Sequence, residues 1–339
     1  MHIGLYRRTL FRLSFLLAVM LAILPAAAAR AALPHDSVTL SLVAYSTPQE
    51  AYGLIIPAFQ KTKAGAGVSF KQSYGASGDQ SIAVGNGLPA DIVAFSLEPD
   101  IGRLVSKGLV APNWYKNKYH GFVTDSVVVF VVRQGNPKHI KTWNDLVKPG
   151  VDVITPNPFT SGGARWNVMA AYGAQLAQHK SAKQATAYLQ NLFSHVSVQD
   201  TSARAELQTF VGGKGDVMLA YENEAITAQE KGQKLDYVIP PQTILIENPV
   251  AVTKTTSHTK EANAFLQFLW STRGQQLFAA KGYRPVVPSV AKTYHFKKPK
   301  TLFTIRSFGL GGWSKVQPQF FDPQKGVMAT IERNKGAAP

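Results

Sequence analysis

The chain has 339 residues, a formal net charge of +16 and no cysteine. The absence of cysteine excludes disulfide bonds, thiol catalysis, thiolate metal sites and a lipid-modified cysteine. The basic charge favours attraction of nucleic acid, anionic membranes or small anions, but it is scattered along the chain. Its only dense run, His295–Lys300, has the composition of a solvated loop.

Residues 1–31 have the three-part pattern of a secretory signal sequence. Arginines at positions 7, 8 and 12 precede an apolar run from Leu13 to Leu24, and small residues follow up to Ala32. The run is too short for a membrane anchor, so we predict cleavage near Ala28 or Ala31 and export of a soluble chain. The remainder is long enough for two domains of about 150 residues each.

The rest of the chain predicts alternating strands and helices. Val38–Ala44 alternates like a strand, and Ser126–Val132 is a β-branched run suited to a strand buried on both faces. The expected strands are Val38–Ala44, Val68–Ser73, Asp91–Phe95, Ser126–Val132, Val151–Thr155, Val217–Ala220 and Ile244–Val252. The expected helices begin near Pro48 and Thr201 and cover Ser77–Asn86, Asp100–Lys107, Ala164–Gln178, Ala182–Phe193 and Glu261–Trp270. This alternation predicts parallel or mixed sheets covered by helices.

Four predicted helix starts share one design, because each follows a strand and carries serine or threonine. Two of the four, at Ser77-Gly78 and Ser161-Gly162-Gly163, also carry glycine. Thr47 and Glu50 fit a capping box at the first. Helix starts present unpaired N–H groups at the positive end of the helix dipole, and ligands of open α/β sheets lie beyond the carboxyl ends of strands. The sequence therefore predicts an oxyanion receptor.

Several segments resemble the periplasmic sulfate-binding proteins, the substrate receptors of ABC sulfate and thiosulfate importers. The matching segments are AYSTPQEAY (44–52), QSYGASGDQ (72–80), the long block from Val131 to Asn167 that ends in SGGARWN, DTSARAELQTF (200–210), GDVMLAYENEA (215–225), YRPVVP (283–288) and FTIRSFGLGGW (303–313). They span essentially the whole chain after the signal sequence. The resemblance implies a monomeric periplasmic receptor, not an enzyme, that needs no cofactor and delivers sulfate or thiosulfate to a membrane permease.

The resemblance also implies a fold and a division into lobes. The expected fold class is the two-lobed α/β periplasmic-binding-protein fold of type II, with a mostly parallel sheet in each lobe and the ligand in the cleft between them. The first lobe would combine residues 37–130 with 245–295, and the second 131–244 with about 300–335. Two crossing segments, Ser126–Arg133 and Ile244–Val252, would join them.

The family holds a dehydrated dianion through backbone N–H groups and hydroxyls. Carried over by position, this implies contacts from the N–H groups of Ser46, Ser77, Gly162, Gly163 and Ala203, the hydroxyl of Ser161, and Tyr221. Ser46 stands where well-known members have Asp, and Tyr221 where they have Trp. Arg165 would act from behind the contacting groups or only order its loop, and Trp166 would pack.

Other functions stay open from the residues alone. Phosphate or a molybdate-like oxyanion would suit the same helix starts, and Asp79 could serve as an acceptor for the phosphate proton. An exported acyl-transfer enzyme could use Ser77, or Ser257 in the S-x-x-K pattern that ends at Lys260. A surface-binding protein could exploit the basic charge. No metal spacing appears among the histidines, and Glu222 and Glu224 are expected to face solvent.

Overall fold

The structure is a computed structural model that describes residues 38–336. The predicted signal sequence, residues 1–31, lies outside these residues. Within 38–336, no helix is both long and apolar enough to cross a membrane.

The described residues form one mixed sheet of eleven strands. Along its main path the order is β2-β1-β3-β9-β4-β7-β5-β6, while β8 and β10 pair with β4, and β11 pairs with β9. The strands are β1 (Val38–Tyr45), β2 (Val68–Gly75), β3 (Ile92–Ala94), β4 (Phe122–Arg133), β5 (Val153–Ile154), β6 (Val196–Val198), β7 (Val217–Tyr221), β8 (Leu235–Val238), β9 (Gln242–Val252), β10 (Arg284–Pro285) and β11 (Thr301–Phe303). β1 is parallel to β2 and β3, and β5 is parallel to β6 and β7, whereas every pairing of β4 is antiparallel.

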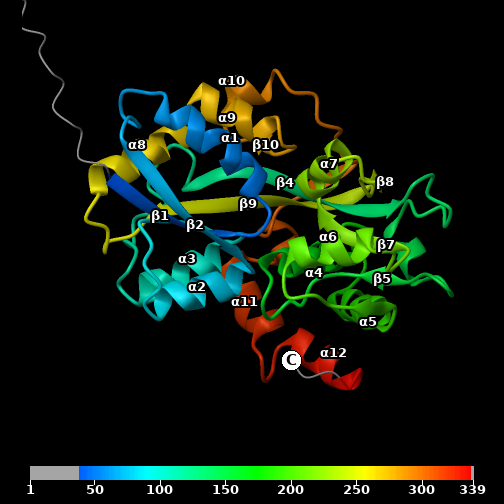
Figure 1. Ribbon diagram of the computed structural model, residues 1–339. Helices are drawn as coiled ribbons and strands as arrows, with labels where there is room; N and C mark the ends of the chain where they lie inside the picture. The colour runs from blue at the N-terminus through cyan, green and yellow to red at the C-terminus, as the bar shows by residue number, and fades with distance from the viewer. Residues whose placement is uncertain (1–37, 337–339) are drawn as a thin grey trace, which may run out of the picture. The chain divides into compact units, whose positions relative to one another are not determined.

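The long strands β4 and β9 occupy the middle of this sheet (Figure 1). β9 pairs with β4 near Ile246 and with β3 near Ala251, while β4 continues past Val128 to pair with β7. The β-branched run Val127–Val132 is at most 1% exposed. The prediction of a strand buried on both faces is therefore confirmed, because β4 has neighbours along both edges and helices over both faces.

Helices cover the sheet on its two faces. They are α1 (Gln49–Gln60), α2 (Ser77–Gly85), α3 (Glu98–Ser106), α4 (Gly162–Leu176), α5 (Ala182–Ser194), α6 (Ala203–Val211), α7 (Glu222–Glu230), α8 (Thr259–Leu269), α9 (Thr272–Ala279), α10 (Pro288–Ala291), α11 (Trp313–Phe321) and α12 (Val327–Asn334), with 3₁₀ turns η1 (Trp143–Val147) and η2 (Ser307–Gly309). Figure 1 shows α1, α8 and α9 above the sheet and α2 and α3 below it.

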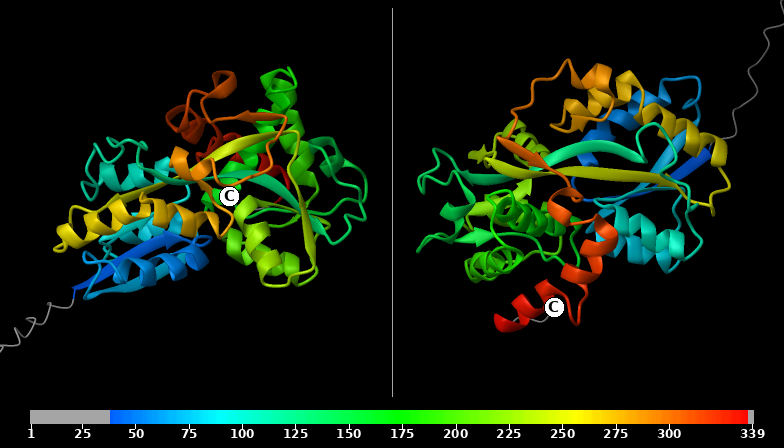
Figure 2. Two further views of the ribbon diagram at one scale, coloured as in Figure 1. Left: turned by 90° about the horizontal axis from the view of Figure 1, so that it is seen from above. Right: turned by 180° about the vertical axis from the view of Figure 1, so that it is seen from behind.

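The apolar core is built from several clusters. One gathers α1, α8 and α9 against β1, where the rings of Phe59 and Phe265 lie 5.1 Å apart. The largest gathers α4 and α5 with the C-terminal helices α11 and α12, which Figure 2 shows in red beside them. There the rings of Tyr172 and Phe320 lie 4.8 Å apart. The C-terminal segment thus completes the core around α4.

The sequence located seven strands but missed four short ones, β6, β8, β10 and β11. It also missed α7, α9 and the individual helices after residue 287. The missed strands have two to four residues each, so they are too short for periodicity to reveal them.

Candidate functional site

The first turn of α4 begins in a glycine pair directly after Ser161. Ser161 is the N-cap, and its hydroxyl oxygen accepts a hydrogen bond from the Ala164 N–H at 3.4 Å. Because the cap uses an oxygen lone pair, the O–H of Ser161 remains able to donate. The N–H groups of Gly162 and Gly163 belong to the first turn, where amides have no partner within the helix. The turn therefore offers three donors in one place.

Ser96, which the sequence reasoning did not select, joins the starts of α2 and α4. Its N–H donates to Ser77 Oγ at 2.9 Å, and a Cβ atom added to Gly162 would stand 2.5 Å from Ser96 Oγ. The hydroxyls of Ser96 and Tyr221 share a hydrogen bond of 2.6 Å. Ser96 follows the end of β3 as Ser46 follows β1. A search for serine residues after the ends of predicted strands could therefore have found Ser96.

Tyr221 and the start of α6 complete the contact with α4. A Cβ atom at Gly163 would stand 2.8 Å from Tyr221 Cε2 and 3.4 Å from Ala203 Cβ. Tyr221 is 2% exposed, and burial raises the pKa of its hydroxyl well above the ordinary value. The phenol therefore keeps its proton at physiological pH and can donate it.

Ser46 lies beside the same group of residues. The rings of Tyr45 and Tyr221 are 6.1 Å apart, and Arg204 Nη2 donates to the carbonyl of Thr47 at 3.3 Å. Ser46, between Tyr45 and Thr47 in the chain, is therefore close to β7 and α6. The contacts thus bring all four predicted helix starts to one region of the molecule.

The predicted capping box of Thr47 and Glu50 is wrong. The N-cap of α1 is Pro48, which makes no side-chain cap, and the Thr47 hydroxyl bonds to that of Tyr283 at 2.9 Å. Glu50 instead accepts two hydrogen bonds from the guanidinium of Arg204, at 2.5 and 2.7 Å. A bidentate bond to a cation is stronger than a neutral cap, so the tertiary contact outweighs the local one.

The five main-chain N–H groups that the sequence reasoning assigned to the anion share one property. The hydrogen bonds within residues 38–336 include none donated by the N–H of Ser46, Ser77, Gly162, Gly163 or Ala203. The first four residues are buried and Ala203 is half-buried. By contrast, the N–H of Gly78 donates to the carbonyl of Thr160 at 3.0 Å. A buried N–H group without an acceptor is costly, so these five N–H groups stand out among the described residues.

The hydroxyl of Ser77 is already occupied. It donates to Asp100 Oδ2 at 2.6 Å and accepts from the N–H of Ser96. Through its bond to Asp100, this hydroxyl connects α2 to α3. Only the N–H of Ser77 remains for a ligand.

Arg165 is buried behind the turn that precedes α4. Its Nε donates to the Pro158 carbonyl at 2.7 Å and its Nη2 to the Phe159 carbonyl at 3.3 Å, while Nη1 reaches Gln317 Oε1 at 3.3 Å. Burial lowers the pKa of this guanidinium. Trp166 is packed, with its Nε1–H donating to the Ser96 carbonyl at 3.0 Å. Arg165 therefore orders the loop that carries Ser161.

Three carboxylates near the site are either exposed or paired with arginine. Asp79 is exposed on the first turn of α2. Glu222 and Glu224 are each 1% exposed, so the expectation that they face solvent is wrong. Glu222 accepts from Arg284 Nε at 2.7 Å, and Glu224 accepts from Arg204 Nη2 at 2.8 Å. Each is buried because an arginine compensates its charge.

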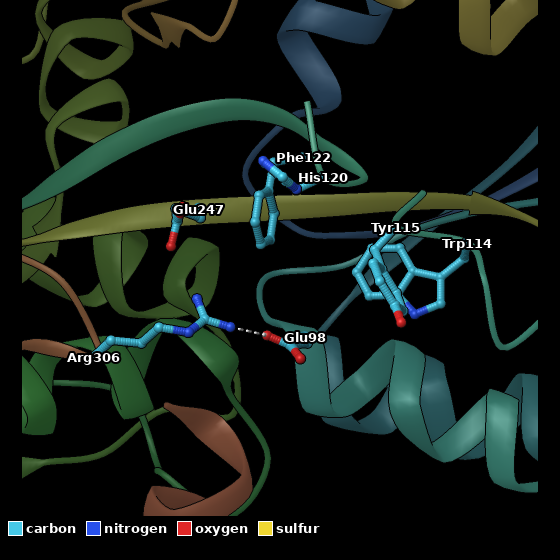
Figure 3. Close-up of a pocket in the computed structure, with 7 residues that line it drawn as sticks. All are labelled: Glu98, Trp114, Tyr115, His120, Phe122, Glu247 and Arg306. Atoms are coloured by element: carbon cyan, nitrogen blue, oxygen red, sulfur yellow. Dashed lines mark ion pairs between the residues drawn. The ribbon is translucent and has the colours of Figure 1, made fainter. Parts of the chain in front are cut away.

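None of these donors lines a pocket of about 560 Å³. Its lining residues are Glu98, Trp114, Tyr115, His120, Phe122, Glu247 and Arg306. Figure 3 shows Arg306 extended toward Glu98, and this ion pair measures 4.0 Å. Two carboxylates would repel a dianion, so this pocket does not suit one. Residues 38–336 also hold no group of three His, Asp or Glu residues placed to bind a metal ion.

Comparison with known proteins identifies the class to which this fold and site belong. The family of bacterial extracellular solute-binding proteins matches residues 40–284, and the chain belongs to this family. The chain is 45% identical to the sulfate-binding protein of Synechococcus elongatus, over 84% of each chain. It is 35% identical to the thiosulfate-binding protein of Pseudomonas aeruginosa, over 85% of this chain and 90% of that protein.

This chain is also similar to a solved structure of a sulfate-binding protein. The sulfate-binding protein SubI from Mycobacterium tuberculosis H37Rv is 44% identical and matches with a TM-score of 0.82, covering 84% of this chain and 100% of that chain. This similarity confirms the predicted fold class, the two-lobed α/β periplasmic-binding-protein fold.

Proposed function

We propose that this protein binds sulfate, and also thiosulfate, in the periplasm and delivers it to an ABC permease. The observation that carries the proposal is the set of five main-chain N–H groups that have no acceptor among residues 38–336 and come from four helix starts that contact one another. The hydroxyls of Ser161 and Tyr221 would add donors. The names of the relatives support these two anions.

The donor set suits a fully dehydrated dianion. Leaving a charged oxygen without donors in a buried site is very costly, so each oxygen needs several. A hydrogen bond to a charged group contributes about 1.5–3 kcal/mol, so six or more exceed the ~8 kcal/mol of a micromolar complex. The remainder would offset the loss of ligand freedom and the closure of the lobes.

The proton that phosphate carries, and sulfate lacks, would explain a preference for sulfate over phosphate. Sulfate has no proton at neutral pH and needs only donors, whereas hydrogen phosphate also needs an acceptor. Near the helix starts, Glu222 and Glu224 are engaged with arginines and Asp79 is exposed, while the buried Glu206 accepts a hydrogen bond from the N–H of Asp200. We therefore infer that a protonated anion would leave its O–H unpaired, at a cost of about 1–3 kcal/mol.

The same proposal includes the division into lobes. The first lobe would combine residues 37–130 with 245–295, and the second 131–244 with about 300–335, joined through β4 and β9. The helix starts of α1 and α2 would then face those of α4 and α6 across a cleft. The protein would act as a monomeric receptor rather than as an enzyme.

Isothermal titration calorimetry with the purified protein tests the function. Sulfate should bind with micromolar or tighter affinity, thiosulfate should compete, and phosphate should bind at least tenfold more weakly because of its unpaired proton. The absence of heat and of thermal protection at millimolar sulfate would reject the proposal. Labelling by a serine-reactive probe would favour an acyl-transfer enzyme instead.

A further inference from the structure

Two acidic residues near the start of α6 meet in the interior. Glu206 is fully buried, and its Oε2 accepts a hydrogen bond from the N–H of Asp200 at 2.9 Å. The other oxygens, Glu206 Oε1 and Asp200 Oδ2, are both buried and have no hydrogen-bond partner among the described residues. Carboxylate oxygens only accept, so two ionised groups would leave both atoms unsatisfied.

One proton would satisfy both oxygens. A protonated carboxyl group is a donor, and the bond from the Asp200 N–H to Glu206 Oε2 already holds the two residues together. Burial raises the pKa of Glu206 to about 8; the hydrogen bond from the Asp200 N–H opposes this shift, and the charge of Asp200 adds to it. Because a charged carboxylate is poorly solvated there, the proton belongs on Glu206 at neutral pH.

We propose that Glu206 is uncharged and shares one proton with Asp200, and that this proton holds the start of α6 where the Ala203 N–H meets the bound anion. The role rests on the proposed function, and Glu206 acts as a positioning residue.

The hydrogen bonds of the loop before α6 explain how the proton could act on the site. The Asp200 carbonyl accepts from the Asn157 N–H at 2.8 Å, and the Thr201 carbonyl accepts from the Thr160 hydroxyl at 2.8 Å. Asn157 and Thr160 belong to the loop that leads into Ser161. A shift of Asp200 would therefore displace donors at the starts of both α6 and α4.

Asp200 is the charged group that faces Glu206 directly. Arg204, on the same turn of α6, is bound to Glu50 and Glu224, and Arg133 at the far end of the helix bonds to main-chain carbonyls. From α12, Glu332 accepts from the side chain of Gln199 at 3.0 Å. The strand beneath α6, β7, contributes Val217–Tyr221 and no charge to the packing.

The shared proton predicts how anion affinity depends on pH. Above about pH 8, ionisation of Glu206 places a second negative charge next to Asp200 and near the dianion. If only the protonated form binds well, the dissociation constant for sulfate rises about tenfold between pH 7 and pH 9. By reciprocity, sulfate binding near pH 8 draws a proton from the buffer.

Calorimetric titration with sulfate in buffers of different ionisation enthalpy tests this inference on the wild type, Glu206→Gln and Asp200→Asn. The wild type should take up several tenths of a proton per sulfate at pH 8 and none at pH 6.5. Glu206→Gln keeps a donor toward Asp200 without an ionisable group. This variant should bind sulfate as tightly as the wild type at pH 7 and take up no proton on binding. Its affinity for sulfate should not fall tenfold at pH 9. Asp200→Asn supplies an amide donor to Glu206. In this variant Glu206 should therefore ionise at lower pH, and the rise in the dissociation constant for sulfate above pH 7 should disappear.

Identical pH profiles in the wild type and Glu206→Gln would overturn the inference while leaving sulfate binding intact. Carbon-13 NMR of the carboxyl groups without sulfate gives an independent readout. Titration of Glu206 near pH 8 is expected, and titration near pH 4.5 would overturn the shared proton. A titration near pH 8 in a protein that binds no sulfate would instead reject both the positioning role and the proposed function.

Discussion

At the scale of single residues, the same atoms serve the fold and the site. The oxygen of Ser161 caps α4, and its proton has no acceptor within residues 38–336. In the same part of the chain the N–H of Ser77 has no acceptor, although the Ser77 hydroxyl is bound to Asp100. Each candidate contact therefore uses the part of the residue that local structure does not need.

Replacing Ser161 by Ala separates these two uses. The loss of the cap should reduce the free energy of unfolding by about 0.5–2 kcal/mol, and the loss of a donor should weaken sulfate binding by about 1–3 kcal/mol. Ser271→Ala is the matched control, because Ser271 caps α9 by the same bond to the Gly274 N–H. Both variants should lose stability in urea unfolding, but only Ser161→Ala should lose affinity. Equal affinities would remove Ser161 from the site.

At the scale of elements, the starts of α4 and α6 pack so closely that only glycine fits between them and their neighbours. Gly162 faces Ser96 and Gly163 faces Tyr221, at distances that leave no room for a methyl group. Glycine is thus required by close approach, since neither residue has a positive φ.

Replacing Gly162 by Ala should reduce sulfate affinity at least tenfold, because the new methyl group would stand 2.5 Å from Ser96 Oγ and displace the first turn of α4. Strain of this kind costs about 1–3 kcal/mol. Gly53→Ala is the control, since a Cβ atom there meets nothing within 4 Å in the middle of α1. That variant should gain about 0.5–1 kcal/mol in the free energy of unfolding and bind sulfate normally. A Gly162→Ala protein with full affinity would contradict the proposed site.

At the scale of the whole molecule, one ion cluster connects elements from distant parts of the chain. Arg204 of α6 binds both Glu50 of α1 and Glu224 of α7, and Lys231 also pairs with Glu50. Burial opposes ionisation of Glu50, but hydrogen bonds from Arg204 and Lys231 outweigh it and lower its pKa to about 2. The charge of Glu50 therefore stabilises the fold above its unfolded pKa, and this stabilisation is lost as the pH falls toward 2.

Glu50→Gln should remove this contribution. The wild type should lose up to about 3 kcal/mol of unfolding free energy between pH 4.5 and pH 2 through this group, and the variant should lack that part of the decline. The variant should also be less stable at pH 7, because Arg204 and Lys231 lose a partner. Glu98→Gln is the control, since its ion pair measures 4.0 Å and is exposed. Urea unfolding across this pH range tests the prediction. If the free energy of unfolding depends on pH in parallel for the wild type and Glu50→Gln, Glu50 does not have this stabilising role.

How much could be predicted depended on the range of the interactions. The long strands β4 and β9 and the apolar face of α8 showed in local periodicity, and the helix starts showed in their serine and glycine residues. Ser96 was missed although it follows a strand end, because it carries no glycine or capping pattern. The partners of Glu50, Glu222 and Glu224 could not be predicted, since each lies on a different element.

The sequence by itself determined the class of fold, the family and the positions of the helix starts, because hydrophobic periodicity, capping residues and motif spacing are local properties. The tertiary structure alone decided which donors remain unpaired, which carboxylates are buried, and that Asp200 and Glu206 meet. Those outcomes depend on packing between elements far apart in the chain, where burial and distance set the energy of every charge and hydrogen bond.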